Sequence, residues 1–269
     1  MAVAYASIQN SGWQVSGTAV VTKPTSLAVG DIMLAYCAGD MTSFPSGFTS
    51  IGSTIAGGNN YKTNLGYKVA DSSDVAASNF TFTLNGSTTN ICVLIRVTGA
   101  SIAASTIISS GTLVSNTATP SITGITPNPR GNNLLFQLWH GSDAVASVAS
   151  YAIATSNPSW TEILDTTAGG GNAGCGIAWA SRPEVTATGN FSAAGGNGTT
   201  DWGGWLISFA PSYSISQAES ITMTETYKNS PSIKIAESST MTETYDNETS
   251  MPWTNQSKNT STWTNQNKS

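Results

Sequence analysis

The first residue that could do chemistry is the single histidine of the chain, His140, which follows the apolar run Leu134–Trp139. A Ser-His-acid triad would have to use this imidazole, but no Gly-x-Ser-x-Gly elbow accompanies it. One histidine also cannot supply the several imidazoles of a typical catalytic zinc site. We therefore expect His140 to be structural, at the end of a strand.

Paired carboxylates offer a second route to catalysis, as in glycoside hydrolases. The acids before residue 214 are Asp31, Asp40, Asp71, Asp74, Asp143, Glu162, Asp165, Glu184 and Asp201. Most of them lie in turn contexts, where Asp hydrogen-bonds the backbone. Glu162 and Asp165 are three residues apart, and regular strand alternation predicts opposite faces for them. The sequence therefore predicts a protein that is not an enzyme, with no catalytic, metal or cofactor site.

Three cysteines, Cys37, Cys92 and Cys175, lie in strand-like runs. An odd number at these spacings indicates neither a disulfide framework nor a zinc site, so buried free thiols are expected. Asp71-Ser-Ser-Asp74 offers oxygen ligands, but it lacks the ordered spacing of a calcium loop.

Aromatic side chains could instead bind sugars by stacking. The second half of the chain holds several tryptophans, and we take Trp160, Trp179 and Trp202 as candidate glycan-stacking residues. The alternative is that they fill the core, which is the more common location of large aromatic residues in strands.

The elements that would position these residues are strands. Hydrophobic residues make up 39% of the chain and charged residues only 9%, with Ser, Thr, Asn and Gly supplying most of the polarity. Thr and other β-branched residues favour strands, whereas Gly and Asn favour the turns between them. Residues 80–84 alternate apolar residues with Thr, and 91–97 are nearly all apolar, which predicts a half-exposed strand and a central strand respectively.

An internal duplication organises these strands. Pro45-Ser46 recurs as Pro158-Ser159 at an offset of 113, and Asn79-Phe80 recurs as Asn190-Phe191 at an offset of 111. We predict an all-β fold, a jelly-roll-like β-sandwich over residues 1–213. Its duplicated halves, about 1–105 and 106–213, are expected to contribute interleaved strands.

A repetitive polar tail follows at residues 214–269. Residues 218–229 recur at 236–247, and Trp253-Thr-Asn-Gln recurs at 263–266. As a strand, the first repeat would place Ile221 and Met223 on one face, which a partner would have to cover. We take Ile221, Met223, Trp253 and Trp263 as candidate partner anchors of an attachment or oligomerisation arm, and a disordered low-complexity tail is the alternative.

Charge and hydropathy narrow the classes of partner. The net charge is −5 and basic residues do not cluster, which disfavours nucleic acid as a partner. No apolar run of 18 residues predicts a membrane span. The first ten residues do not read as a signal peptide, so synthesis in a cytoplasm is expected.

The order Gly-Asp (30–31), Pro-Ser-Gly-Phe-Thr-Ser-Ile (45–51), Tyr-Lys-Val-Ala (67–70) and Asn-Phe-Thr-Phe (79–82), with the terminal Trp repeats, resembles β-sandwich proteins of tailed bacteriophages. Those include head-decoration, minor tail and tail-fibre proteins. The resemblance implies a structural protein on the virion surface that binds other virion proteins, as a homo-oligomer and by analogy a trimer. It implies no catalytic residues and no cofactor.

Two other functions remain open on the sequence. The first is a carbohydrate-binding module for adsorption to host-surface glycans, which can coexist with a virion role. The second and less favoured is a polysaccharide hydrolase, which would need two carboxylates facing one cleft.

Overall fold

The structure is a computed structural model, and it describes residues 2–15, 17–56, 62–85, 89–103, 106–115, 117–129, 131–142, 149–153, 159–168, 173–194 and 201–212. The chain divides into a first unit, Met1–Ser216, and a second, Gln217–Ser269. The second unit, with the candidate anchors Ile221, Met223, Trp253 and Trp263, lies outside the described residues. The account below concerns the first unit.

The first half of this unit forms two antiparallel sheets. Its elements are β1 (Ala4–Gln14), β2 (Thr18–Thr22), β3 (Ile32–Ala38), β4 (Met41–Ser43), β5 (Thr49–Ser50), β6 (Ile55–Ala56), β7 (Lys62–Val69), α1 (Ser72–Ala76), β8 (Asn79–Leu84) and β9 (Asn90–Thr98). The strand order β1-β9-β3-β7-β5, with β6 also on β7, makes the first inner sheet, and β2-β8-β4 makes the first outer sheet.

The second half repeats this connectivity. Its strands are β10 (Ile107–Val114), β11 (Ser121–Ile122), β12 (Asn133–Ser142), β13 (Ala149–Ile153), β14 (Thr161–Thr167), β15 (Ala173–Arg182), β16 (Phe191–Ala194) and β17 (Trp202–Phe209). The second inner sheet has the order β10-β17-β12-β15-β14, and the second outer sheet has the order β11-β16-β13. Matched strand by strand, these orders are the same as those of the first half.

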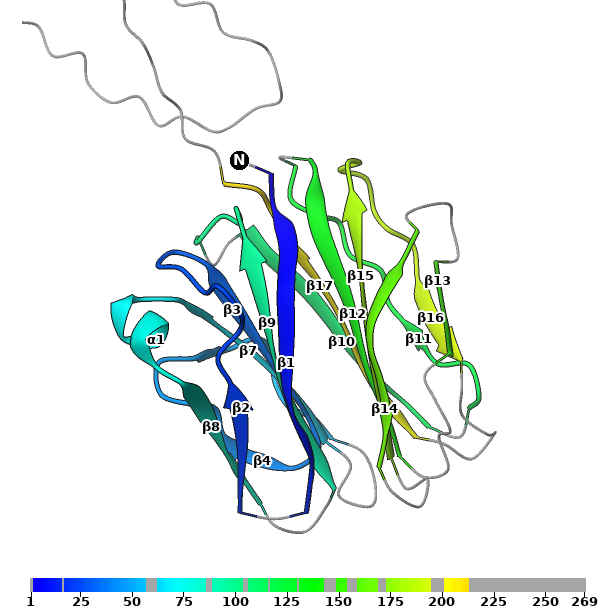
Figure 1. Cartoon of the computed structure of the whole chain (residues 1–269). Coiled ribbons are helices and arrows are strands. Elements are labelled where there is room, and N and C mark those ends of the chain that lie inside the picture. The colour runs from blue at the N-terminus through cyan, green and yellow to red at the C-terminus, as the bar shows by residue number, and fades with distance from the viewer. Residues whose placement is uncertain are drawn as a thin grey trace, which may run out of the picture. The chain divides into compact units, whose positions relative to one another are not determined.

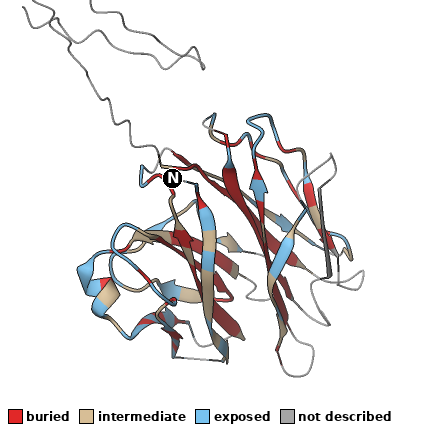
Figure 2. Cartoon of the chain, turned by 45° about the horizontal axis from the view of Figure 1, so that its top comes forward, coloured by how far each residue is buried: buried red, intermediate tan, exposed pale blue. Residues whose placement is uncertain are grey.

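The four sheets form successive layers, and the two inner sheets face each other (Figure 1). A central core between the inner sheets includes Ile95 and Tyr36 from one half and Phe136, Ile207 and Phe209 from the other. Each inner sheet also buries its opposite face against its own outer sheet. Buried residues therefore follow the inner strands, while outer strands and turns carry most of the exposed ones (Figure 2).

This layering explains the sequence patterns and confirms the predicted all-β sandwich. β8 alternates exposed and buried residues because one face of an outer sheet meets solvent. β9 lies between β1 and β3 and is buried on both faces, as its nearly continuous apolar run predicts.

The expectation of interleaved strands is wrong. Within the described ranges, every ladder between named strands joins strands of one half, and the bridge that links the halves is Ala100 with Pro211. The N–H of Ser101 donates to the carbonyl of Ala210 at 2.8 Å, and that of Ser212 donates to the carbonyl of Gly99 at 2.7 Å. Apart from these contacts, the ladders of the named strands are completed within each half, and the halves stack through side chains.

Aromatic side chains form much of this stacking contact. The indole N–H of Trp205 crosses from the second half and donates to Thr63 Oγ1 at 3.0 Å. The ring of Tyr5 stacks on that of Trp179, with centroids 5.8 Å apart. Gly111 makes room for the contact, because a Cβ there would lie 2.8 Å from both Ile55 and the Trp205 ring. Close packing at this junction therefore requires glycine in β10.

Candidate functional site

A pocket of about 370 Å³ opens at one edge of the first half. It lies beside β4, an edge strand of the first outer sheet, and β5, which pairs with β7 at the edge of the first inner sheet. Most of the residues that line it have short polar or aromatic side chains, and the full set is Met41, Thr42, Ser43, Phe44, Pro45, Phe48, Ser50, Thr54 and Asn64. We define this set as the edge pocket.

A tight turn builds the aromatic side of the edge pocket. The N–H of Phe48 donates to the carbonyl of Pro45 at 3.4 Å, and Gly47 between them has a φ of 85°. Turns with positive φ at the third position select glycine. The turn stacks Phe48 on Phe44, with ring centroids 6.3 Å apart. Phe48 meets Phe80 of β8 edge-on, which ties the turn to the outer core of the first half.

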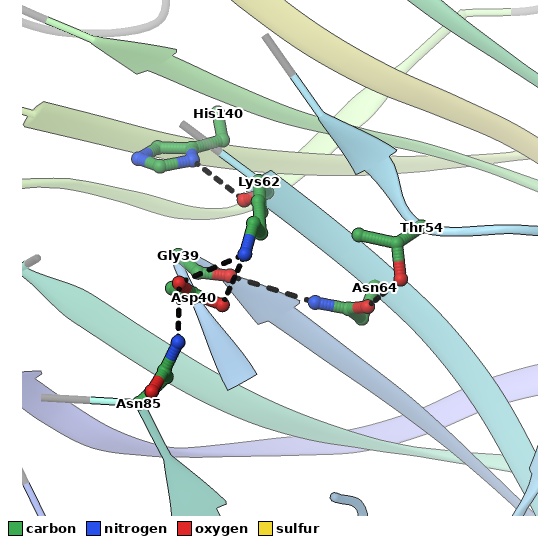
Figure 3. A network of polar contacts seen from close by, with 7 residues as sticks. All are labelled: Gly39, Asp40, Thr54, Lys62, Asn64, Asn85 and His140. Carbon is green, nitrogen blue, oxygen red and sulfur yellow. Dashed lines mark hydrogen bonds and ion pairs between the residues drawn. The ribbon is translucent and has the colours of Figure 1, made fainter. Parts of the chain in front are cut away.

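Hydroxyls and an amide make the polar side. Thr54 donates its hydroxyl to Asn64 Oδ1 at 2.6 Å, and Asn64 Nδ2 lies 3.5 Å from the carbonyl of Gly39 (Figure 3). These contacts fix the orientation of the Asn64 amide. Ser43 and Ser50 are exposed on the same pocket. The edge pocket therefore offers ring surfaces beside neutral hydrogen-bonding groups.

A buried ion pair supports this end of the first half. Asp40, only 3% exposed, receives hydrogen bonds at 2.9 Å from Lys62 Nζ on both carboxylate oxygens. Asn85 Nδ2 donates to Asp40 Oδ2 at 3.0 Å (Figure 3). These bonds compensate the carboxylate for its lost hydration. The geometry suits the anchoring of β7 and the end of β8.

His140 lies on the other side of Lys62 and does not reach the edge pocket's lining. Its Nδ1 is 3.4 Å from the carbonyl of Lys62, and its ring packs against Trp13 with centroids 6.3 Å apart. Burial lowers the pKa of His140 from 6.5 to about 3. The imidazole is therefore neutral near pH 7 and forms part of the contact between the halves.

The structure corrects the expectation for Glu162 and Asp165. A bulge in β14 shifts the register between Glu162 and Leu164, so Glu162 pairs with Ala178 and Asp165 with Gly176. Because these partners are two residues apart on β15, both carboxylates lie on the same face. Burial and the nearby Asp165 charge raise the pKa of Glu162. Neither acid lines the edge pocket.

Other acids have structural partners. Asp31 pairs with Arg96 at 2.7 Å, and Asp74 pairs with Lys68 at 2.6 Å. Burial lowers the pKa of Lys68, but the bonds and charges of Asp74 and Asp71 outweigh burial and raise it. Asp71 caps α1 by accepting the N–H groups of Ser73 and Asp74. In the described part of the chain, no three His, Cys, Asp or Glu side chains gather as a metal site.

The three candidate glycan-stacking tryptophans do not form one platform. Trp202 is fully buried, and its N–H donates to the carbonyl of Thr117 at 2.9 Å, so the expectation of a sugar-binding face there is wrong. Partly buried Trp179 stacks on Tyr5 and packs against the central core. Partly buried Trp160 packs against the second outer core instead.

Trp160 is the counterpart of Phe48 in the repeat. It meets Phe191 edge-on, with centroids 5.4 Å apart and planes at 80°, while Phe48 meets Phe80 at 6.2 Å and 80°. The equivalent geometry explains why an aromatic residue follows each Pro-Ser step. In both halves this ring closes the edge of a sandwich.

Sequence reasoning missed the edge pocket. Phe44 and Phe48 come from the loop between β4 and β5, Thr54 comes from the segment between β5 and β6, and Asn64 comes from β7, and no shared spacing links these three segments. The available signal was the Pro45-Ser46-Gly47-Phe48 turn, which the sequence shows as a landmark of the repeat.

In the described residues, no helix has the length and apolar character needed to cross a membrane. In comparisons with known proteins, no family model, no curated protein and no solved structure matched this chain.

Proposed function

We propose that this chain is a structural protein of a virion surface, a capsid-decoration or tail-associated protein of a tailed bacteriophage, made in the host cytoplasm. It acts by protein–protein contacts. The observation that carries the proposal is the central core, which joins two sandwiches of the same connectivity into one block through buried apolar side chains. A block held by one continuous close-packed core has a persistent shape, which suits a structural role.

The sequence resemblance supports this reading. The quoted motifs at 45–51, 67–70 and 79–82 correspond to the edge-pocket turn, to β7 and to β8. The buried carboxylates Asp40 and Asp74 form internal ion pairs with Lys62 and Lys68. On this proposal, residues 214–269 attach the protein to other virion proteins or join copies into a homo-oligomer, a trimer by analogy.

Immunogold electron microscopy tests the proposal. Antibody raised against residues 1–213 should label particles from the source at regular positions. Labelling of heads would identify a decoration protein, and labelling of tails would identify a fibre or minor tail protein. An absence of labelling on every particle would refute the virion role.

The edge pocket favours a second candidate function, the binding of host-surface glycans. Phe44 and Phe48 supply ring surfaces, and Ser43, Ser50 and Thr54 supply hydroxyls that can exchange hydrogen bonds with a sugar. A few polar groups beside aromatic surface are typical of ligand sites, and the pocket volume is at the lower end of their range. The proposed glycan site thus moves from the tryptophans to the opposite half.

A glycan array with the full chain tests this second function. Exposed Ser50 lines the pocket, so Ser50→Trp should fill it and lower the signal of any bound glycan at least about tenfold, the equivalent of about 1.4 kcal/mol. Thr22→Trp is the matched control, because Thr22 is exposed on β2 at the opposite edge of the first outer sheet. Equal loss with both variants, or binding unchanged by Ser50→Trp, would exclude the pocket.

A further inference from the structure

Two of the three cysteines are immediate neighbours. Cys37 on β3 is directly opposite Cys92 on β9 in the ladder, and their sulfur atoms are 3.2 Å apart. Carbon atoms pack best at about 3.5–4.0 Å, so these larger sulfur atoms are closer than ordinary packing brings even carbon atoms. Cys175 is on β15 of the second inner sheet and packs in the central core, whereas Cys37 and Cys92 pack in the core between the first inner and first outer sheets.

We propose that Cys37 and Cys92 form a cross-strand disulfide when the protein folds in the presence of a low-molecular-weight disulfide. Opposite residues of an antiparallel pair have Cα atoms about 4.5 or 5.5 Å apart, and disulfides span about 4.4–6.8 Å. The sulfur atoms need to approach by only about 1 Å to reach the bond length of about 2.05 Å. Small side-chain rotations therefore suffice, and the strands keep their register.

The reaction balances with glutathione disulfide as the oxidant. One cysteine thiolate attacks glutathione disulfide, which forms a mixed disulfide and releases one glutathione thiolate. The second cysteine thiolate attacks the protein sulfur of that mixed disulfide, which forms the Cys37–Cys92 bond and releases the second glutathione thiolate. The two protons lost by the cysteines end on the two glutathiones, and the protein has lost two electrons.

Burial of the two thiols determines the stage at which the Cys37–Cys92 disulfide forms. Both thiols are fully buried between the first inner and first outer sheets, with Phe82 and Leu94 in the same cluster. Burial raises the pKa of Cys92, and its neighbour Cys37 raises it further. Because the thiolate is the attacking species, the folded pair reacts slowly, and the disulfide forms during folding.

The bond would connect two neighbouring strands of the first inner sheet, β3 and β9, which also contribute Tyr36 and Val93 to the central core. It would close a long segment of chain, which restricts the unfolded state. This inference does not depend on the proposed function.

Refolding of the full chain tests it. Protein unfolded and reduced is refolded with a glutathione redox couple or with excess dithiothreitol, and free thiols are then alkylated under denaturing conditions. After oxidative refolding, we expect alkylation at Cys175 alone, and a linked pair of peptides containing Cys37 and Cys92 in mass spectrometry. The oxidised protein should unfold at a temperature on the order of 10 °C higher than the reduced one.

Controls separate the pair from the third cysteine. Cys175→Ala should leave the link intact, and Cys92→Ala should abolish it. The measurement on the unsubstituted chain stands even if a variant fails to fold. Three alkylated thiols after oxidative refolding, or a link that involves Cys175, would overturn the proposal.

Discussion

Burial of His140 disfavours protonation of its imidazole in the folded protein. The imidazole lies between the halves, against Trp13 and the carbonyl of Lys62, and burial lowers its pKa from 6.5 to about 3. The equivalent position in the first half is Ala38. Ile32 and Leu134 occupy equivalent places in β3 and β12, and Ala38 and His140 each follow them by six residues. Divergence of the halves at this position has placed a titratable group in the contact between them.

We therefore predict a dependence of stability on pH that His140 causes. Between pH 3 and 6.5 the unfolded chain binds a proton that the folded protein excludes, so folding stability decreases as the pH falls below 6.5. From pH 7.5 to pH 5, the loss attributable to this group is about 2 kcal/mol. Urea unfolding at several pH values measures it.

His140→Ala is the matched variant, because it installs the residue found in the first half. Its stability at pH 7.5 should be lower, since a cavity remains, but its change between pH 7.5 and pH 5 should be smaller than in the unsubstituted protein. The same pH dependence in both proteins would show that other groups cause it.

At the scale of elements, the strands at the contact between the halves leave no room for an added methyl group at Gly111. β10 approaches β6 and β17 at Gly111, where a Cβ would lie 2.8 Å from Ile55 Cδ1 and from the Trp205 ring. Trp205 is also held by its hydrogen bond to Thr63 of β7. The Trp205 ring therefore cannot move away without loss of this bond and of contacts in the central core, whereas Ile55 Cδ1 is the end of a flexible, partly buried side chain.

Gly111→Ala should therefore destabilise the protein by about 1–3 kcal/mol through overpacking. This loss should occur even though alanine loses less backbone entropy than glycine when a strand forms. Denaturant midpoints measure this change. The double variant Gly111→Ala with Ile55→Val should recover part of the loss, because it removes the Cδ1 atom that the new methyl meets. If the single variant is as stable as the parent, the close packing of β10 is not as described.

For the whole first unit, the central core is the feature that couples the halves. Its buried members come from both inner sheets in similar numbers, and they include the fully buried aromatic residues Tyr36, Phe136 and Phe209. A half taken alone would expose the apolar face of its inner sheet to water. The halves are therefore mutually dependent in stability.

We predict that the first unit unfolds in one cooperative transition. Circular dichroism, which reports on the strands of both halves, and tryptophan fluorescence should give the same midpoint, although five of the six tryptophans before residue 214 lie in the second half. Phe136→Ala in the central core should lower the free energy of unfolding by about 3–5 kcal/mol. The midpoint should shift by the same amount with both probes, and the transition should not split into two. Two resolved transitions would mean that each half is independently stable.

Much of the fold follows from the sequence because it depends on local chemistry. Apolar residues at every second place in 80–84 and at nearly every place in 91–97 correctly distinguish an outer strand from an inner one. The recurring Pro-Ser-aromatic step correctly marks equivalent positions, since Phe48 and Trp160 close equivalent edges. These features concern neighbours along the chain or the two faces of one strand, which periodicity reports directly.

Only the tertiary structure determines how segments far apart in the sequence lie relative to one another. Stacking instead of interleaving depends on which strands pair with one another in space, and one extra residue in β14 reverses the predicted placement of Asp165 relative to Glu162. The edge pocket and the pair Cys37–Cys92 likewise join residues far apart in the chain. Strand periodicity records the face of a residue, but it carries no information on the strand that will lie opposite, because register is set by long-range pairing.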